Sequence, residues 1–241
     1  MTTLSVAHLG PTAYRDGLAL QEGLVRARAE GRTGDWLLYP DHPPVLTVGR
    51  SGSRSGESLR ADPESLRRLG IEIFEVARGG DYTWHGPGQL VGYVVCDLTE
   101  RDRDLRRFLR DLERSLISAL AEWGLAGEAV PGRTGVWVGG EKIASLGVAV
   151  RRWVSYHGFA LNVAPDLGFF DLIHPCGLRG IHMTSLASRL GPAAPTLSEA
   201  REVVARHLAR QLGHPTWRWG TADEARRLSA SAAPQPVEIA H

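Results

Sequence analysis

The order of strand-like and helix-like segments is the feature that most limits the folds open to this chain. Short apolar segments recur along the sequence, and helical spacing appears between some of them but not between all. Residues 136–138 and 143–150 read as two strands joined by Gly139-Gly140, which supply the backbone freedom that a tight hairpin turn needs. Hairpins without regular strand–helix alternation favour an α/β fold of the α+β type. We therefore expect a mixed sheet flanked by helices, and not a doubly wound parallel sheet.

Four segments have the features of helices, either apolar residues three and four apart or a cap residue followed by proline. They begin near residues 14, 62, 102 and 198, and the longest runs from about Asp102 to Trp123. The last helix is expected to begin at Ser198, as its cap, and to end at Leu212. The other predicted strands cover residues 5–9, 36–39, 45–48, 71–76, 89–95 and 156–163.

The length of 241 residues suits one substantial domain, and no internal repeat or interior linker is visible. We expect a single domain over residues 1–219. Beyond Trp219 the sequence becomes rich in alanine, serine and proline. Residues 220–241 are therefore interpreted as a poorly anchored tail.

Composition and charge exclude several classes of function. A formal net charge of +1 offers no basic field for nucleic acid. No apolar stretch approaches the roughly 18 residues of a membrane span, and the N-terminus does not have the pattern of a signal peptide. Two cysteines exclude a disulfide framework. These features predict a cytoplasmic protein with free thiols that binds neither nucleic acid nor membrane, and a monomer is the default expectation.

The single lysine is unusual. Lysine and arginine together number 28, yet only Lys142 is a lysine. Lysine can lose its proton when it is desolvated, whereas arginine effectively cannot, so Lys142 is a candidate for proton chemistry. It begins an apolar strand just after a turn, where partial burial is expected. The alternative is a surface lysine with no role.

Two further segments have the composition of functional loops. Residues 78–89 contain four glycines and one proline, which suits a backbone that bends sharply or approaches a ligand, although an ordinary structural loop remains the alternative. Gly86-Pro87-Gly88 leads into a strand and not a helix, so it does not fit a dinucleotide fingerprint. Neither a phosphate-binding loop motif nor a zinc-helix motif is present in the sequence.

The two cysteines have different surroundings. Cys96 lies in an apolar run and is interpreted as a core residue, whereas Cys176 stands between proline and glycine. From local sequence alone Cys176 is either a reactive thiol or part of a loop. A free thiol is only about 3% ionised at pH 7, so a nucleophilic cysteine needs a cation or base beside it. Lys142, His85 or His157 could supply that group.

Several motifs together resemble one family. They are Arg-Gly-Gly-x-x-Thr-x-His-Gly-Pro-Gly-Gln at residues 78–89, Gly-x-Lys-Ile-Ala-Ser-Leu-Gly at 140–147, His-Gly-x-Ala-Leu-Asn at 157–162, and Pro-Cys-Gly at 175–177. In this order and spacing they are similar to the signature segments of the octanoyltransferases of lipoate biosynthesis. Asp41-His42-Pro43-Pro44 also fits, and the resemblance covers roughly residues 4–212. Leu178 stands where the family commonly has isoleucine.

The resemblance implies a fold, an activity and a site. The fold would be that of the biotin- and lipoate-protein ligase catalytic domain, and residues 1–219 would be the octanoyltransferase domain. Cys176 would be the acyl-thioester nucleophile, and Lys142 would activate it as general acid and base. The substrate-binding residues implied are Arg78, Gly79, Gly80, Asp81, Tyr82, Thr83, Trp84, His85, Ser145, Leu146, Gly147, Gly158, Phe159 and Ala160.

The resemblance also implies partners. The donor would be octanoyl-acyl carrier protein. The acceptors would be the lipoyl domains of 2-oxoacid dehydrogenase E2 subunits and the H protein of glycine cleavage. Neither a cofactor nor a metal is expected, because the octanoyl group arrives already activated as a thioester. Two alternatives stay open: an ATP-dependent lipoate- or biotin-protein ligase on the same fold, and a non-enzymatic module that binds lipoyl domains or acyl groups.

Overall fold

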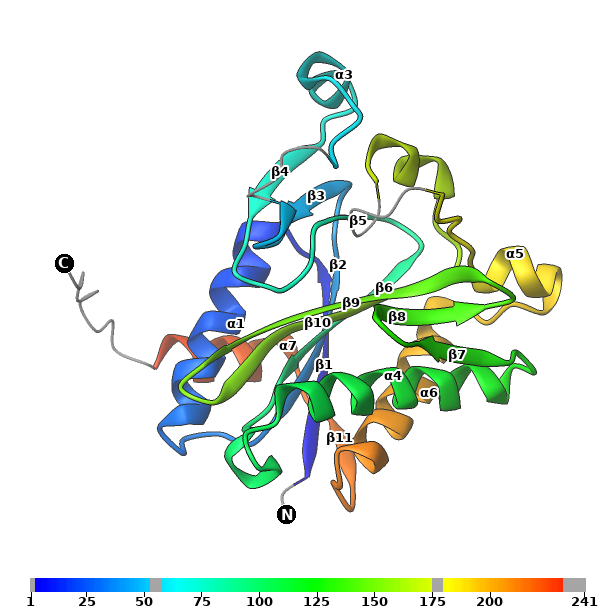
Figure 1. The fold of residues 1–241 in the computed structure, drawn as a ribbon. Coiled ribbons are helices and arrows are strands. Elements are labelled where there is room, and N and C mark those ends of the chain that lie inside the picture. The colour runs from blue at the N-terminus through cyan, green and yellow to red at the C-terminus, as the bar shows by residue number, and fades with distance from the viewer. Residues whose placement is uncertain (1–2, 53–57, 175–179, 232–241) are drawn as a thin grey trace.

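The computed structural model describes residues 3–52, 58–174 and 180–231 (Figure 1). Within these residues the largest feature is an eight-stranded mixed sheet. In spatial order its strands are β11 (Trp217–Trp219), β1 (Leu4–Pro11), β2 (Trp36–Asp41), β6 (Gln89–Val95), β10 (Val154–Asn162), β9 (Glu141–Arg151), β8 (Arg133–Val138) and β7 (Gly127–Val130). The strands β11, β1 and β2 run parallel, and the pairs from β2 to β7 are antiparallel.

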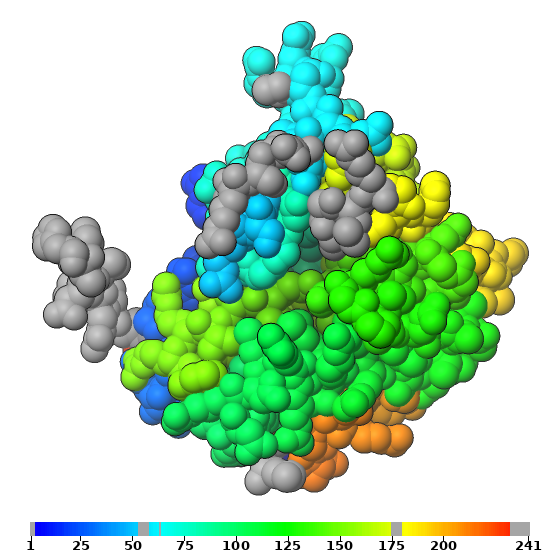
Figure 2. Space-filling model, viewed as in Figure 1, coloured from blue at the N-terminus to red at the C-terminus, as the bar shows by residue number. Residues whose placement is uncertain are grey.

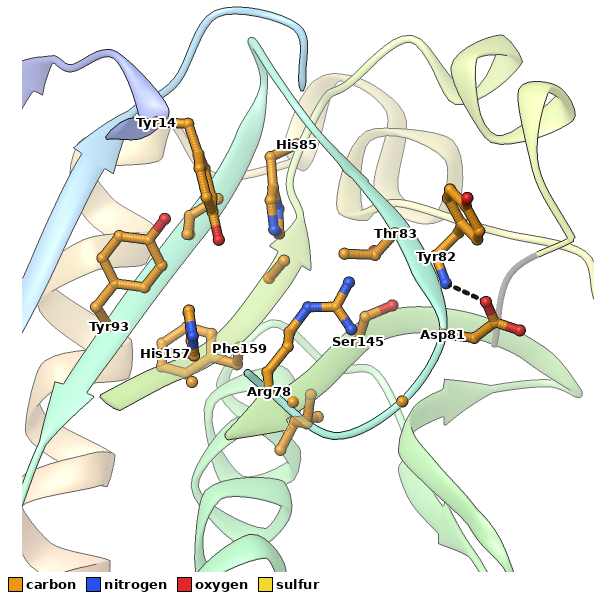
Figure 3. A pocket seen from close by; sticks show the side chains of 16 residues that line it. Tyr14, Arg78, Asp81, Tyr82, Thr83, His85, Tyr93, Ser145, His157 and Phe159 are labelled. Atoms are coloured by element: carbon orange, nitrogen blue, oxygen red, sulfur yellow. Dashed lines mark hydrogen bonds between the residues drawn. The ribbon is translucent and has the colours of Figure 1, made fainter. Parts of the chain in front are cut away.

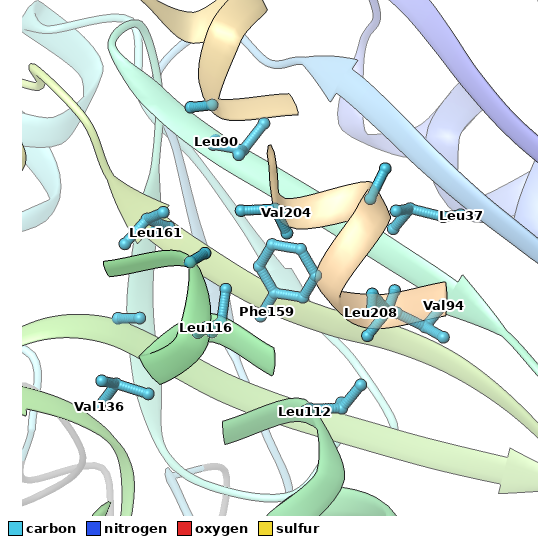
Figure 4. Packing of buried hydrophobic residues seen from close by; sticks show 14 of the residues in the cluster. Leu37, Leu90, Val94, Leu112, Leu116, Val136, Phe159, Leu161, Val204 and Leu208 are labelled. Atoms are coloured by element: carbon cyan, nitrogen blue, oxygen red, sulfur yellow. The ribbon is translucent and has the colours of Figure 1, made fainter. Parts of the chain in front are cut away.

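Helices cover both faces of this sheet (Figure 1). On one face lie α4 (Leu105–Glu122) and α6 (Leu197–Gln211), and on the other lie α1 (Tyr14–Ala29) and α7 (Ala222–Ala230). In the core beneath α4 and α6, Phe159 of β10 packs among Leu116, Val204 and Leu208 (Figure 4). The shorter helical segments are α3 (Pro63–Arg68), η1 (Thr99–Arg101), η2 (Leu167–Leu172), α5 (Leu186–Leu190) and η4 (Gly191–Ala193).

A second, three-stranded sheet lies apart from the main one. It consists of β4 (Glu72–Glu75), β3 (Val45–Val48) and β5 (Tyr82–His85), with β3 in the middle. Its own small core contains Leu46, Trp84 and Phe170. The space-filling view shows α3 projecting beyond this part of the molecule (Figure 2). The small sheet matters for the site because β5 continues directly from the glycine-rich residues 78–81.

The expected fold class is confirmed: the sheet is mixed and helices flank it. The predicted hairpin is also present, as β8 and β9 pair directly. Gly139 and Gly140 have φ angles of +56° and +80°, in the left-handed region that the two central residues of such a turn require. Cys96 is fully buried as expected, and its Sγ donates a hydrogen bond to Asp35 Oδ2 at 3.1 Å.

Two helix starts differ from the expectation. The helix expected from Asp102 begins at Leu105, because Asp102 itself has φ +57° and the carboxylate of Asp104 caps the helix by accepting from Arg107 N. The helix expected from Ser198 is capped by Thr196, which forms a reciprocal capping box with Glu199. In both cases a competing cap residue lies two positions from the predicted one.

The expectation of a poorly anchored tail from residue 220 is wrong for residues 220–231. They contain α7, which packs against α1 and buries Ala225 completely. Thr221 caps the helix by accepting from Glu224 N. The alanine-rich composition that suggested a tail is here the composition of a helix with a small apolar face. Residues 232–241 lie outside the described residues.

Within the described part of the chain, none of the helices combines the length and the apolar character that crossing a lipid bilayer would demand.

Candidate active site

A pocket lies between the small sheet and one face of the main sheet (Figure 3). It encloses about 490 Å³ of space free of protein atoms, part of it open to solvent. Residues of β5 and the loop before it form one wall, and β6, β9 and β10 form the floor. The lining residues are Tyr14, Arg78, Gly80, Asp81, Tyr82, Thr83, His85, Val91, Tyr93, Ser145, Leu146, Gly147, His157, Gly158, Phe159 and Ala160.

Hydrogen bonds hold the glycine-rich loop in place. The Arg78 guanidinium donates from Nη2 to Thr47 O at 2.8 Å and to Thr47 Oγ1 at 2.7 Å. Asp81 accepts from Tyr82 N at 2.7 Å and from Ser58 Oγ at 2.5 Å. Gly80 between them has φ +85°. The loop is thus held at Arg78 by Thr47 of β3 and at Asp81 by Ser58, which restrains this wall of the pocket.

All but two of the substrate-binding residues implied by the sequence line this pocket. Trp84 does not: it is fully buried and stacks on Phe169 with ring centres 5.0 Å apart. Side chains alternate along β5, so Thr83 and His85 face the pocket while Trp84 faces the small core. Gly79 also lies outside the lining, and its N–H donates to Val148 O of β9 at 3.0 Å.

Two histidines and two tyrosines line one part of the pocket, and a third histidine, His42, contacts this group. His42 Nε2 lies 2.6 Å from Tyr93 Oη, the His42 and His85 ring centres are 6.2 Å apart, and the Tyr14 and His85 rings are stacked at 6.4 Å. Sequence reasoning did not single out Tyr14 or Tyr93. A signal was available for Tyr93, because it alternates with Val91 on the strand face opposite to the core residues Leu90 and Val94.

The imidazoles of this group are held neutral. Burial lowers the pKa of His85 to about 3, with the neighbouring His42 acting in the same direction. Burial lowers the pKa of His157 to about 3 as well, and the positive charge of Arg78 adds to the effect. Burial raises the pKa of Tyr14 to about 12. Near neutral pH these side chains therefore act as uncharged hydrogen-bonding groups.

His157 has an uncommon backbone conformation for a strand residue. Its φ angle is +59°, and its N–H donates to Gln21 Oε1 of α1 at 2.7 Å. Gln21 is itself fully buried and donates to Gly17 O. Left-handed backbone at a non-glycine residue costs free energy, and the buried bond from α1 offsets part of that cost. The result is a histidine side chain that lines the pocket.

A β-bulge sets the direction of Lys142. Ile143 and Ala144 are consecutive yet both belong to the core beneath α4 and α6, which a regular strand does not allow. The pairing register shifts at this point: Val136 pairs with Ala144, but Trp137 pairs with Lys142. One extra residue on β9 thus turns Lys142 to the opposite face. That face is the one on which Ser145 and Gly147 line the pocket.

Lys142 is almost completely buried on that face, with 1% of its surface exposed. Its Nζ lies 5.7 Å from the centre of the Trp137 ring. A Cβ at Gly135 would lie 2.6 Å from Lys142 Cε, so only glycine leaves room for the lysine stem. Its backbone bonds to the segment that follows residues 175–179: Lys142 N donates to His182 O at 2.9 Å, and Thr184 N donates to Lys142 O at 2.9 Å.

Cys176 lies outside the described residues, so its position relative to Lys142 stays a prediction. No group of three or more histidine, cysteine, aspartate or glutamate side chains arranged to hold a metal occurs in the described part of the chain.

Buried neutral histidines make stability depend on pH. In the unfolded chain a histidine has a pKa near 6.5 and therefore binds a proton below that pH. In the folded protein His85 and His157 stay neutral at the same pH, so protonation favours the unfolded state. We therefore expect the free energy of unfolding to fall by about 2 kcal/mol for each of these residues between pH 7.5 and pH 5. Urea unfolding followed by circular dichroism measures this change.

The variant His157→Asn checks the assignment, because asparagine tolerates positive φ and does not titrate. Between pH 7.5 and pH 5 the variant should lose about 2 kcal/mol less of its free energy of unfolding than the wild type loses. An unchanged loss in the variant would contradict the assignment of His157.

The sequence is similar to a known family model and to known proteins. The family model of the lipoyl protein ligase A/B catalytic domain matches residues 13–209. A protein of Myxococcus xanthus named octanoyltransferase is 46% identical over 211 residues, which cover 85% of this chain and 58% of that protein. An octanoyltransferase of Geobacter metallireducens is 47% identical over 203 residues, covering 84% of this chain and 91% of that protein.

The fold is similar to that of a solved ligase. A crystal structure of lipoate-protein ligase A bound with ATP superposes with a TM-score of 0.76 at 20% identity, over 98% of this chain and 97% of that chain. At this identity the likeness concerns the fold, which is the one expected from the sequence motifs.

Proposed function

Because this chain belongs to the octanoyltransferase family, a family of acyltransferases, we propose that it transfers an octanoyl group from octanoyl-acyl carrier protein to a specific lysine of a lipoyl domain. In this proposal the group is held on Cys176 as a thioester between the two half-reactions. The reaction exchanges a thioester for a more stable amide. It therefore runs downhill without ATP.

The observation that supports this proposal best is the placement of Lys142. The only lysine of the chain is buried, and a bulge turns it to the face of β9 that lines the pocket. Lys142 precedes Ser145 by three residues, which is about 10 Å along a strand. In the proposal, an acyl group lying over Ser145–Gly147 has its reactive end towards Lys142.

The proposed chemistry moves one proton back and forth. Lys142 Nζ takes the proton from Cys176 Sγ, and the thiolate attacks the thioester carbonyl of the donor. The carrier's thiol leaves with that proton. In the second half, the amine of the acceptor lysine attacks the acyl-enzyme, Lys142 takes a proton from the amine, and Cys176 Sγ regains a proton as it leaves. Without such a partner only about 3% of a free thiol is ionised at pH 7.

The pocket is suited to an acyl chain of limited length. Its floor is formed by small and apolar residues of β6, β9 and β10, among them Val91, Gly147 and Ala160. Each buried methylene contributes about 0.8 kcal/mol, so an octanoyl chain gains several kcal/mol from this floor. His157 pairs with Val148, and Tyr93 pairs with Gly158, so both lie at the end of the pocket away from Lys142. An acyl chain longer than octanoyl would have to displace these polar side chains.

We further propose the partners and setting. The donor is octanoyl-acyl carrier protein, and the acceptors are lipoyl domains of 2-oxoacid dehydrogenase E2 subunits and the glycine cleavage H protein. No cofactor takes part. The protein acts as a monomer in the cytoplasm.

A reaction with defined components tests the proposal. The purified chain is mixed with octanoyl-acyl carrier protein and an unmodified lipoyl domain, and the mass of the lipoyl domain is followed with and without ATP and Mg²⁺. We expect one octanoyl group to be added at the same rate in both cases. The fold is shared with a ligase that binds ATP, so the competing function is an ATP-dependent ligase. Transfer only from free octanoate or lipoate with ATP would establish that function instead.

A further inference from the structure

A chain of four hydrogen-bonded groups connects the pocket to the strand that carries Lys142. His85 Nδ1 lies 2.7 Å from Gln89 Oε1, and Gln89 Nε2 donates to Asn162 Oδ1 at 3.0 Å. Asn162 Nδ2 in turn donates to Thr184 O at 3.0 Å. The side chains of His85, Gln89 and Asn162 are all buried, with at most 7% of each residue exposed.

The donor and acceptor of each hydrogen bond in this series are fixed by its last member, Thr184. Thr184 O is a backbone carbonyl and can only accept, so Asn162 must present its Nδ2 there and its Oδ1 to Gln89. Gln89 must then donate through Nε2 and present Oε1 to His85. A carbonyl oxygen accepts, so His85 Nδ1 carries the proton. His85 is neutral, and its Nε2 is therefore an unprotonated nitrogen that can only accept a hydrogen bond.

The same chain reaches the backbone of Lys142. Thr184, whose carbonyl accepts from Asn162, donates its N–H to Lys142 O at 2.9 Å. Two residues earlier, His182 O accepts from Lys142 N at 2.9 Å. Met183 between them pairs with Lys142 as a parallel bridge. Asn162 thus fastens the segment that holds Lys142 to the edge of the pocket floor.

We propose that Gln89 and Asn162 are positioning residues. Gln89 holds His85 with its Nε2 as a hydrogen-bond acceptor on the wall of the pocket, and Asn162 holds the 182–184 segment, and through it Lys142, in register with that pocket. The consequence for catalysis rests on the proposed acyl transfer, whereas the two positions themselves can be measured without any activity.

Two variants test the two parts of the hydrogen-bond chain separately: the part at His85 and the part at Lys142. Asn162→Asp keeps the shape and can still accept from Gln89, but it places an oxygen against Thr184 O and so disturbs only the Lys142 half. Gln89→Leu removes the partner of His85 and leaves the bond between Asn162 and Thr184 intact. Ser155→Ala is the matched control. It lies on the same strand as Asn162, is fully buried, and loses bonds to Cys96 N and Val94 O at the other end of that strand.

Nitrogen-15 NMR of the full-length protein gives a readout independent of activity. In the wild type, the imidazole of His85 should carry its proton on Nδ1 at every pH from about 5 to 8, because its pKa is about 3. Gln89→Leu should relax this preference to a mixture of tautomers, and Asn162→Asp should preserve it. A proton on Nε2 in the wild type, or a tautomer that does not respond to Gln89→Leu, would overturn the His85 half.

Because Lys142 is the single lysine of the sequence, its positioning by Asn162 can be observed directly. Labelling lysine with nitrogen-15 at the ε position gives one side-chain resonance, that of Lys142. Asn162→Asp should shift or broaden this resonance and lower kcat for octanoyl transfer by about ten- to a hundredfold, with KM for the donor changed far less. Ser155→Ala should change neither. If Asn162→Asp matches the control in both measurements, Asn162 does not position Lys142; if the wild type shows no transfer, the proposed function fails while the resonance still decides the positioning.

Discussion

Replacing Lys142 with methionine is expected to reduce octanoyl transfer by about a thousandfold or more. General acid–base groups contribute typically 10²- to 10⁴-fold, and here the same amine serves both half-reactions. Methionine retains most of the stem length next to Gly135 and Trp137, so the fold should persist. Lys142→Arg should be nearly as inactive as Lys142→Met, because arginine keeps the positive charge but does not give up its proton near neutral pH. The rate of octanoyl addition to a lipoyl domain measures both variants.

The chain offers a matched control for this substitution. Arg133 lies over the same Trp137 ring, with its guanidinium carbon 5.9 Å from the ring centre against 5.7 Å for Lys142 Nζ. Arg133 is exposed and does not line the pocket. Arg133→Met should therefore change the transfer rate by less than about threefold. Equal losses in the two variants would mean that a cation on Trp137 matters and that proton transfer by Lys142 does not.

Replacing Cys176 with alanine is expected to remove transfer completely. The proposed intermediate needs a sulfur to hold the octanoyl group, and no neighbouring residue type in Pro175-Cys176-Gly177 can replace it. Cys176→Ser should also be inactive or nearly so, because an alkoxide is far harder to form than a thiolate. Binding of octanoyl-acyl carrier protein should survive in both variants, and gel-shift or fluorescence titration measures it.

The other cysteine provides the comparison. Cys96 is fully buried, and burial raises the pKa of its thiol, so Cys96→Ala should leave transfer within about threefold of the wild type. Activity that depends on Cys96, or transfer at the wild-type rate by Cys176→Ala, would contradict the assignment of the nucleophile.

Local sequence rules predicted much of the framework. The amphipathic stripe of α4 and the glycine-supplied turn between β8 and β9 follow from spacing alone, because each depends on residues close in sequence. The predicted cap of α6, Ser198, is two residues late, because Thr196 forms both halves of a capping box with Glu199. The prediction for the segment after Trp219 is wrong, because α7 is stabilised by packing on α1, which is far away in the sequence.

The candidate site was partly visible in the sequence. Lys142 stood out as the only lysine, but the reason that it faces the pocket is a one-residue register shift at Ile143, which no local pattern reveals. The motif predicts that Trp84 binds substrate together with its neighbours, whereas alternation along β5 directs its side chain into the small core. The cluster of His42, His85 and Tyr93 comes from three separate strands or loops, so only the fold brings it together.

In the proposed mechanism, Cys176 holds the octanoyl group as a thioester. Intact-protein mass spectrometry after brief mixing with octanoyl-acyl carrier protein, in the absence of any lipoyl domain, tests it most directly. We expect one octanoyl group per chain, located by peptide mapping at Cys176, released by neutral hydroxylamine and passed on when a lipoyl domain is added. An unmodified chain that still octanoylates the lipoyl domain at full rate, or an adduct on any other residue, would contradict it.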